Sequence, residues 1–479
     1  MEFTDLKKTD YRTSTFTLSP IHVTYANTLR RLILTGVETI AFRSDMTSTG
    51  STTNVLVKQN DTPMTNEMLA DRIGLIPIHI TEPNTWNSDQ YIFHLNVSGK
   101  ADHTTYVTAS DFVVKKILPL MDEKDSNSDE NNVDEKNEIV STDEFFPKHH
   151  LTGQTCLIAT LQPGSGSNQQ HIEITAKASK GTGREHARFC PVSQCSYEYT
   201  QDNDPQRIEE MFQKWLINAK KISNIDKASD RYQELQREFN TMQIKRCYKV
   251  DDKNEPYSFD FTVESLGILS VEYIVERACE VGQNMCSRYI NMDTGNIPPE
   301  ITITSANCKL IGFDFLVRGH DHTLGNLLQT WLVHNLIEGD GEPKITYAGY
   351  SVPHPLRDEM ILRIGVENGE EKTAREAFAA AARGCVEIFQ QLRTAWRSAI
   401  GATPLTLTTA PRTIRRPGSK SASKVSTKPS SSSASASASS SSSTDDKKPT
   451  PPPSKPTGVR QRPTIKSAPT VAAKPASSS

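Results

Sequence analysis

The sequence predicts an α+β fold built from two related halves. Three observations support this prediction: a strand pattern, a helix pattern and an internal repeat. Some segments alternate apolar and polar residues, the period of two that is typical of strands with one buried face. These strand segments are 257–263, 311–317 and 360–366. Other segments repeat apolar residues at helical spacing, which predicts one-sided amphipathic helices. These helical segments are 26–33, 208–216, 271–285 and 324–332.

The longest predicted helix begins at a capping box, with Thr373 as its cap and Glu376 three residues later. Its apolar stripe continues to Trp396. A stripe of this length needs a partner along the helix, and the segment 271–289 is the best candidate within the chain. An ordinary core helix would show the same pattern.

A faint internal repeat supports the division into two halves. In each copy, an apolar strand pattern is followed by a Thr-Leu helix and then by a glycine with a nearby proline, where a turn begins. The copies have these residues at Thr28-Leu29, Gly74 and Pro77, and at Thr323-Leu324, Gly349 and Pro353. The repeat predicts two related halves, the first of them enlarged by insertions.

Charge is unevenly distributed along the chain of 479 residues, although the formal net charge is only -3. From residue 401 onward there are thirteen basic and two acidic residues, so this tail carries +11 and the remainder -14. The tail is rich in Ser and Pro, and the segment 122–144 holds ten acids and two lysines. Neither segment has enough apolar side chains to offset the entropy of ordering, so both are expected to be disordered.

Several classes of function are disfavoured by what the sequence lacks. No two of the eight cysteines have the Cys-x-x-Cys spacing of a zinc or iron site, and reduced intracellular thiols are expected. No apolar run approaches the length of a membrane span, and charged residues stand where a signal peptide has its apolar core. No phosphate-binding loop, metal-binding Asp-x-Asp-x-Asp run or pair of His ligands is found.

The first half resembles a known family. The segments Tyr25–Ile33 (YANTLRRLI) and Asn66–Ile78 (NEMLADRIGLIPI) resemble the assembly subunits of DNA-directed RNA polymerases. These are the bacterial alpha subunit, the archaeal D subunit and the third-largest subunit of eukaryotic RNA polymerase II. The resemblance continues through residues 177–199 and resumes at 259–282.

The second half, Phe313–Trp396, is similar to the archaeal L subunit and to the eleventh subunit of RNA polymerase II. Its signature is Asp321–Leu328 (DHTLGNLL), followed by Ala348–Pro355 (AGYSVPHP). These subunits are normally separate chains that form a heterodimer, so the resemblance implies a single-chain fusion of the two. Such a fusion fits the polymerases of large DNA viruses, and a viral origin is predicted.

The resemblance gives the predicted domains. Two alpha-like dimerisation modules, each an antiparallel sheet with helices, pair within the chain. Residues 1–80 and 200–290 form the first module, 81–199 an inserted mainly-β domain with an acidic disordered loop at 121–145, 291–308 a linker, 309–400 the second module, and 401–479 the disordered basic tail. The linker makes the pairing intramolecular, so no homodimer is required.

Family members do no chemistry and serve as the platform on which the two large catalytic subunits assemble. No catalytic residue is therefore predicted here. The predicted interface between the modules consists of Leu29, Ile33, Leu324, Leu327, Leu328, Phe378, Phe389 and Trp396. The predicted contacts to a large subunit are Arg30, Arg31, Arg72, Arg184 and His186. For the arginine pair of the first helix, simple exposure to solvent is the alternative.

Four residues are predicted to form structural turns: Gly74, Pro77, Gly349 and Pro353. Gly74 would adopt a positive backbone angle after its helix, and Pro77 would begin the next strand. His322 and Asn326 have a spacing that could place two ligands on a metal, but no third ligand is evident, and a capping or interface role is favoured.

The resemblance also implies partners and location. We expect the largest and second-largest polymerase subunits and small zinc-binding subunits as partners, with DNA reached only through the complex. No cofactor or metal is expected in this chain, because the cysteine cluster of many relatives is missing, while the large subunits would use magnesium. An intracellular location is expected: host cytoplasm and virion for a virus, with the nucleus as the alternative.

Two other classes of function were weighed. The +11 tail could bind nucleic acid weakly and without sequence preference, in a salt-dependent way. A stand-alone enzyme could use Cys190, His186 and Glu185. Deletion of the tail tests the first alternative, and mutation of Cys190 tests the second.

Overall fold

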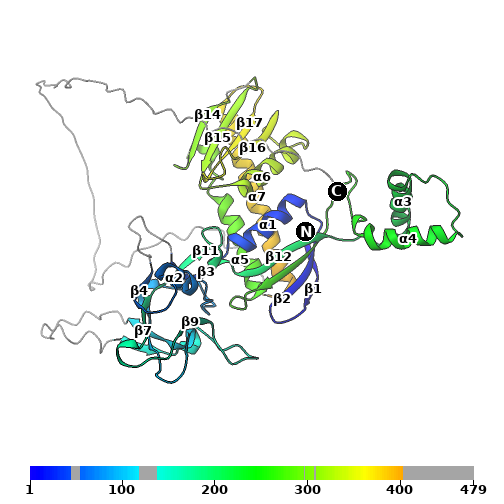
Figure 1. Cartoon of the computed structure of the whole chain (residues 1–479). Coiled ribbons are helices and arrows are strands. Elements are labelled where there is room, and N and C mark those ends of the chain that lie inside the picture. Colours follow the sequence, from blue (N-terminus) through cyan, green and yellow to red (C-terminus); the bar gives the residue numbers. More distant parts are fainter. Residues whose placement is uncertain (45–53, 118–136, 296, 307–308, 403–479) are drawn as a thin grey trace, which may run out of the picture. The chain divides into compact units, whose positions relative to one another are not determined.

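The computed structural model describes residues 1–44, 54–117, 137–295, 297–306 and 309–402. These residues form an α+β structure with several antiparallel sheets, as predicted (Figure 1). The predicted basic tail, apart from its first two residues, and most of the predicted acidic loop lie outside the described residues.

The first module is a four-stranded sheet with two helices. The strand order is β1 (Glu2–Lys8), β2 (Thr13–Ser19), β13 (Phe259–Ser265) and β12 (Val192–Tyr199). Every second residue of β2 and β13 is buried, which confirms the predicted period of two. The helices are α1 (Val23–Thr35) and α5 (Val271–Ser287). Their apolar faces lie in the same core as the sheet.

The second module repeats this plan. Its strand order is β14 (Ile301–Ser305), β15 (Gly312–Arg318), β17 (Glu359–Gly365) and β16 (Tyr347–Ser351). Its helices are α6 (His322–Leu332), which continues as a π-helical turn over Val333–Ile337, and α7 (Glu371–Ala399). At 1.5 Å per residue, α7 is about 43 Å long. Such a helix extends well beyond its own four-stranded sheet.

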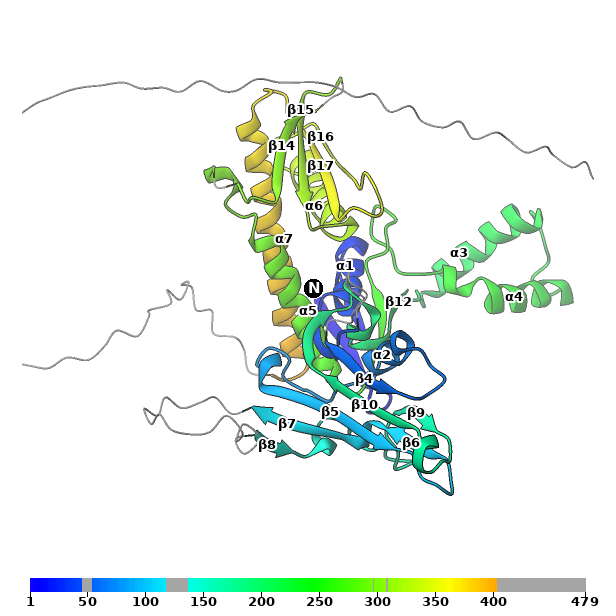
Figure 2. The same cartoon turned by 60° about the vertical axis from the view of Figure 1, so that its left-hand side comes forward.

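The long helix α7 joins the two modules. It packs along α5, contacts β15 of its own module and also contacts β1 of the first module. Both views show α7 and α5 side by side (Figure 2). The predicted pairing of the longest helix with the segment 271–289 is therefore confirmed.

The start of α7 differs from the prediction. The helix begins at Glu371 with Glu370 as its cap, so Thr373 lies inside the first turn. Asn368 takes the role that was expected of Thr373: its side chain accepts a hydrogen bond from the Glu370 N–H and donates one to the Thr373 hydroxyl. An Asx-type turn thus precedes the helix, and sequence spacing alone did not distinguish it from a capping box.

The predicted linker is partly a strand. Residues 301–305 of the predicted segment 291–308 form β14 and pair with β15. Residues Met292–Thr294 form a short 3-10 turn, which Arg383 of α7 fastens by hydrogen bonds to the Ile290 carbonyl (2.6 Å) and to Asp293 (2.9 Å). The described residues of the connection therefore pack with the second module.

The inserted domain has a core of its own, around a sheet with the strand order β4-β10-β5-β7-β8. Its strands and helix are β4 (Val55–Asn60), α2 (Asn66–Gly74), β5 (Tyr91–Ser98), β7 (Phe112–Ile117), β8 (Asn137–Val140) and β10 (His171–Ala176). The short pairs β6 (Thr105–Thr108) with β9 (Leu157–Leu161), and β3 (Glu38–Phe42) with β11 (Ala178–Thr182), accompany it.

The predicted limits of this domain at 81 and 199 are not those of the structure. β4 and α2 belong to the inserted core, whereas β12 pairs with β13 of the first module. β8 also lies within the predicted disordered loop 121–145. Phe145, the last residue of that loop, is buried. Strand partners distant in the sequence decide these limits, and composition does not report them.

A helical hairpin between β12 and β13 has a third, small core. It consists of α3 (Pro205–Trp215), a π-helical turn over Leu216–Lys220, and α4 (Asp230–Met242). Phe212, Tyr232 and Phe239 pack against one another there. We refer to residues 204–246 as the helical arm.

Candidate subunit interface

The two modules meet first where α1 packs against α6. Leu29 and Ile33 of α1 and the three predicted leucines of α6 are fully buried in one core. A buried hydrogen bond of 3.1 Å joins the hydroxyls of Thr330 and Thr24, one from each helix. These five residues of the predicted interface are thus buried in the core to which α1 and α6 both contribute.

The second contact is the seam between α5 and α7. Gly282 of α5 faces Phe389 of α7, and a Cβ added at Gly282 would lie 2.7 Å from the ring of Phe389. Glycine is needed here because the helices approach more closely than a larger residue allows. Phe378 packs against Tyr289 at the end of α5 and Phe315 of β15, with ring centroids 5.7 and 5.2 Å apart.

Trp396 extends the seam into the sheet of the first module. Its ring lies 5.0 Å from Phe3 and 5.1 Å from Phe16, and its indole N–H donates to the Glu272 carbonyl at 3.0 Å. The side chain is fully buried. The end of the second module's helix is thus part of the first module's core.

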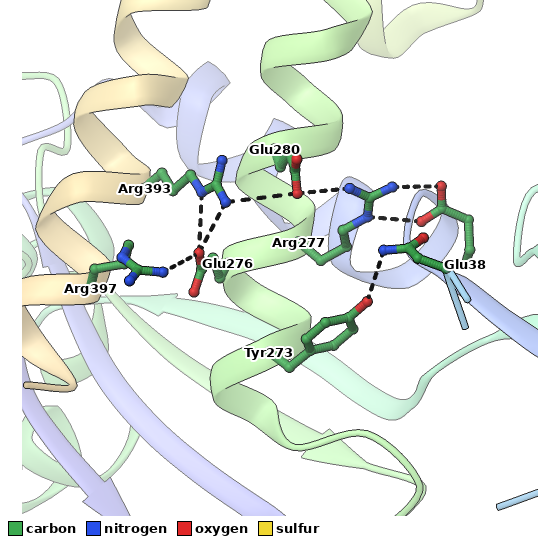
Figure 3. A network of polar contacts seen from close by, with 8 residues as sticks. Glu38, Tyr273, Glu276, Arg277, Glu280, Arg393 and Arg397 are labelled. Atoms are coloured by element: carbon green, nitrogen blue, oxygen red, sulfur yellow. Dashed lines mark hydrogen bonds and ion pairs between the residues drawn. The ribbon is translucent and has the colours of Figure 1, made fainter. Parts of the chain in front are cut away.

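A network of charged side chains lies along the seam (Figure 3). Glu276 of α5 accepts hydrogen bonds from Arg393 and Arg397 of α7, at 3.1 and 2.7 Å. Glu280 pairs with Arg277 at 2.7 Å and lies 3.9 Å from Arg393. Each side chain is a third exposed or less, so solvent screens these pairs less than it screens surface pairs.

Arg277 extends this network to β3. Its guanidinium makes two hydrogen bonds of 3.0 Å to the carboxylate of Glu38, a bidentate arrangement. Burial alone would raise the pKa of Glu38, but the hydrogen bonds and charge of Arg277 outweigh it, and the pKa is lowered. The bond to Glu38 in turn raises the pKa of Arg277. This charge pair was not predicted from the sequence, which gives no sign that residues 38 and 277 meet.

Comparison with known families decides the identity of both modules. A family model described as the RNA polymerase Rpb3/Rpb11 dimerisation domain matches residues 15–286, more than half of the chain. The chain belongs to this family. A second model with the same description matches residues 313–395, which are β15 to α7. The two matches follow one another in the chain, and together they cover most of both modules, without β1 and β14.

The individual proteins that this chain resembles have low sequence identity to it. The human DNA-directed RNA polymerases I and III subunit RPAC1 is 24% identical over 314 residues, which cover 60% of this chain and 83% of the relative. The subunit Rpo3 of Methanosphaera stadtmanae is 21% identical over 308 residues, covering 60% and 97%. A conjugation stage-specific protein of Tetrahymena thermophila is 26% identical over 288 residues, covering 55% and 85%.

Two of the residues predicted to contact a large subunit also join the two Rpb3/Rpb11 modules. Arg31 donates to the hydroxyl of Thr323 at 2.9 Å and lies 3.4 Å from Asp321, the cap of α6. Arg184 donates to the carbonyl of Gly319 at 3.1 Å and pairs closely with Asp358. For these two arginines, the structure shows intrachain partners that the sequence analysis did not foresee.

The remaining three predicted contacts lie apart from one another. Arg72 donates to the Leu157 carbonyl at 3.2 and 3.1 Å, and His186 accepts from Arg188 as the cap of a 3-10 turn. Arg30 donates to Asn27 at 3.0 Å and lines a cleft of about 440 Å³ against β12. Their contact with a large subunit stays a prediction.

Arg188 is a residue whose role the sequence analysis missed. Its side chain is 3% exposed and donates to the Phe42 carbonyl at 2.9 Å and to the hydroxyl of Ser44. A Cβ added at Gly74 would lie 2.6 Å from its guanidinium. Arg188 therefore fixes the end of β3 against α2, and Gly74 provides the space.

The predicted turns are only partly confirmed. Gly74 is the last residue of α2 and has no positive backbone angle; the space it leaves for Arg188 explains it better. Pro77 follows in a segment outside the assigned strands, and Gly349 lies within β16. Pro353 does lie in the turn between β16 and β17.

A cleft of about 660 Å³ lies between the modules. Arg184, Arg288 and Arg318 line it, together with His320. Burial lowers the pKa of His320, and the charges of Arg184 and Arg288 lower it further. Its basic side chains come from both modules, so this cleft exists only because the modules pair.

The residues of the alternative enzyme are otherwise engaged. Glu185 pairs with Arg43 at 2.6 Å, and His186 accepts hydrogen bonds from Arg188. Burial raises the pKa of the Cys190 thiol, which disfavours the reactive thiolate. His322 contacts the hydroxyl of Tyr350 at 3.3 Å, a contact within the second module, so its predicted capping or interface role stays a prediction. Among the described residues, no group of three His, Cys, Asp or Glu side chains is arranged to hold a metal.

Proposed function

We propose that this chain is the non-catalytic assembly platform of a multisubunit DNA-directed RNA polymerase, and that its two modules form an intramolecular dimer on which the two large catalytic subunits join. One observation carries the proposal: both Rpb3/Rpb11 modules share a single core, which contains all eight predicted interface residues. A dimer that forms within one chain needs no second copy.

The fusion has an energetic consequence. A short connection gives the second module an effective concentration of roughly millimolar, about a thousandfold above a partner free at about micromolar concentration. That ratio is worth on the order of 4 kcal/mol. In the folded chain, β14 in the sheet and Arg383 on the turn before it order part of this connection.

The proposed partners are the largest and second-largest polymerase subunits, with small zinc-binding subunits beside them. The printed names of the human and archaeal relatives, subunits of DNA-directed RNA polymerases, support this assignment. Catalysis and its magnesium would belong to the large subunits, and DNA would be contacted through the complex. We propose no metal or cofactor for this chain.

Source and location are also proposals. A fused pair fits a large DNA virus, with assembly in the host cytoplasm and packaging into the virion; a cellular source would favour the nucleus. None of the helices in the described part of the chain has the length and apolar character to cross a membrane.

Affinity purification tests the function. The tagged chain, purified from its native source, should bring down two very large subunits, and the eluate should synthesise RNA without a promoter. Leu328→Asp should lose both subunits, because it breaks the shared core, whereas Ile139→Asp on the exposed edge of β8 should keep them. Recovery of the wild-type chain alone would contradict the proposal.

A further inference from the structure

A cleft of about 480 Å³ separates the first module from the inserted domain. Five segments line it: the turn between β1 and β2, the residues after α2, Ala109 after β6, the loop from 146 to 156, and the turn between β13 and α5. None of the contacts between the two modules described above involves this cleft. The proposed pairing of the modules therefore leaves it open.

The charged lining of this cleft has one sign. Arg12, Lys148 and the imidazoles of His79, His149 and His150 line it, and no Asp or Glu does so among the described residues. Lys148 is exposed, with Asp143 3.9 Å away, a long ion pair in water. The cleft is therefore suited to an anionic group.

Arg12 is the best placed of these cations. Its Nε is buried without a hydrogen-bond partner among the described residues, and its guanidinium lies over the ring of Tyr11 at 4.8 Å. Elsewhere in the fold, Arg277 and Arg363 each hold a carboxylate with two nitrogens. The buried Nε is out of reach of an outside group, but the side chain of Arg12 lines the cleft, so the outer nitrogens of its guanidinium are positioned to receive an acceptor from outside the chain.

The floor of the cleft is apolar. Ile76 and Phe146 are nearly fully buried there, and Ile268 lies beside them. Leu266 at its rim is 37% exposed, and Leu151 in the lining loop is 80% exposed. Large apolar side chains at the edge of a charged cleft are typical of protein contacts.

We propose that this cleft binds an acidic and apolar peptide segment of a partner chain, with a carboxylate on Arg12 and a large apolar side chain on the floor formed by Ile76 and Phe146. The inference rests on the proposed function in one respect: the partner is taken to be a polymerase subunit. Charge complementarity selects the occupant, because the cleft offers donors and apolar surface, and the nearby carboxylates of Asp10 and Asp143 do not line it.

A peptide fits this cleft better than a nucleic acid. Single strands bind along a basic groove on aromatic rings whose faces are open to successive bases. Here Arg12 covers the ring of Tyr11, and His150 meets that ring nearly perpendicularly, at 84°. Arg12 and Lys148 are the lining residues with a permanent charge. The aromatic side chains thus form no series of open parallel faces.

Fluorescence anisotropy with the purified full chain tests the binding chemistry. The probe is a labelled nonapeptide of alternating aspartate and phenylalanine, and its matched control has asparagine in place of each aspartate. We expect the acidic probe to bind about tenfold more tightly than the amide control, as one charge-assisted bidentate contact provides. Arg12→Gln should lose this preference, and Arg12→Lys should retain part of it.

Arg246→Gln is the matched control variant, since Arg246 is an exposed arginine on the helical arm. Its affinity should equal that of the wild type, and thermal melts should show that all variants are folded. Equal affinity for the two peptides, or an unchanged preference in Arg12→Gln, would overturn the proposal. So would absence of binding.

Two further measurements separate the other occupants. Displacement of the probe by a twelve-residue oligothymidylate at a lower concentration than by unlabelled peptide would assign the cleft to nucleic acid and overturn the proposal. A tenfold rise in probe affinity after removal of residues 118–136 would assign it to the chain's own acidic segment, with the same consequence. No change in either measurement supports a partner chain.

The assembled complex tests the identity of the partner. A complex purified by means of the tagged Arg12→Gln chain should lose one polymerase subunit in a salt wash. The complex purified with the wild-type chain should keep all its subunits in the same wash. Retention of every subunit by both would overturn the assignment to a polymerase subunit. If even the wild type brings down no polymerase subunit, the proposed function fails, while the peptide titration still decides whether the cleft binds acidic peptides.

Discussion

The two modules and the two insertions are stabilised in different ways. The modules share one core, in which α7 of the second module contacts β1 of the first. The inserted sheet and the helical arm each have a separate core. Each module would expose a large part of its apolar surface without the other, whereas each insertion buries its own.

Because the two modules share one core, we infer that they pair and fold in one event. A substitution at the seam should therefore destabilise both modules together, and a change in an insertion should remain local. Four substitutions or deletions should distinguish a shared core from independent ones.

The largest effect is expected from Leu328→Asp, which places an unpaired charge in the shared core. The free energy of unfolding should fall by at least about 4 kcal/mol, and both modules should lose structure in one transition. Denaturant unfolding followed by circular dichroism measures it. Leu356→Asp is the control, because Leu356 is 89% exposed and its replacement should change little. Loss of the second module alone would refute a shared core.

Trp396→Ala should follow, at about 3–5 kcal/mol, because it leaves a cavity between α7 and the sheet of the first module. Hydrogen exchange should accelerate in β1 and β2, where Phe3 and Phe16 lose their partner. Trp215→Ala in the helical arm is the control, and its effect should be confined to the arm. Protection of β1 that survives Trp396→Ala would show that the first module folds independently.

The pairing of Glu38 with Arg277 should give a smaller and pH-dependent effect of about 1 kcal/mol. The folded pKa of Glu38 is below its usual 4.5, so its contribution is present above pH 4.5 and is lost as pH falls through the folded value. Glu38→Gln should lower stability at pH 7, and its deficit should shrink as the pH falls from 4.5 through the lowered folded pKa of Glu38. Glu210→Gln, at an exposed site, should show no such trend. A deficit independent of pH would mean that the carboxylate does not act through its charge.

The smallest effect is expected from replacing the helical arm, residues 204–246, by a short Gly-Ser loop. The stability of the rest should change by less than about 1 kcal/mol, because the arm has its own core. Its ends are already held together by a hydrogen bond of 2.8 Å from the Asp202 N–H to the Cys247 carbonyl. Calorimetry of the shortened chain measures it. A large loss would show that the arm is coupled to the sheet of the first module.

Much of the fold could be predicted because apolar residues repeat with a characteristic period in strands and in helices. The alternation of Phe259, Phe261 and Val263 indicated β13, and the stripe ending at Trp396 indicated α7. Limits of domains were harder: β12 and β4 were placed on the wrong side of a boundary, because strand pairing over long sequence distances decides it. Periodicity indicated which helix faces are apolar, and the family resemblance assigned residues of those faces to an interface.

The sequence by itself determined the two modules, their order and the apolar residues that bury against one another. Only the tertiary structure decided the polar half: that Arg31 and Arg184 face the second module, that Arg277 holds Glu38, and that Gly74 makes room for Arg188. The two kinds of contact differ in how far along the sequence their determinants lie. Apolar burial depends on a residue's own periodicity, whereas an ion pair or a steric gap depends on which distant segment arrives opposite, and no local pattern records that.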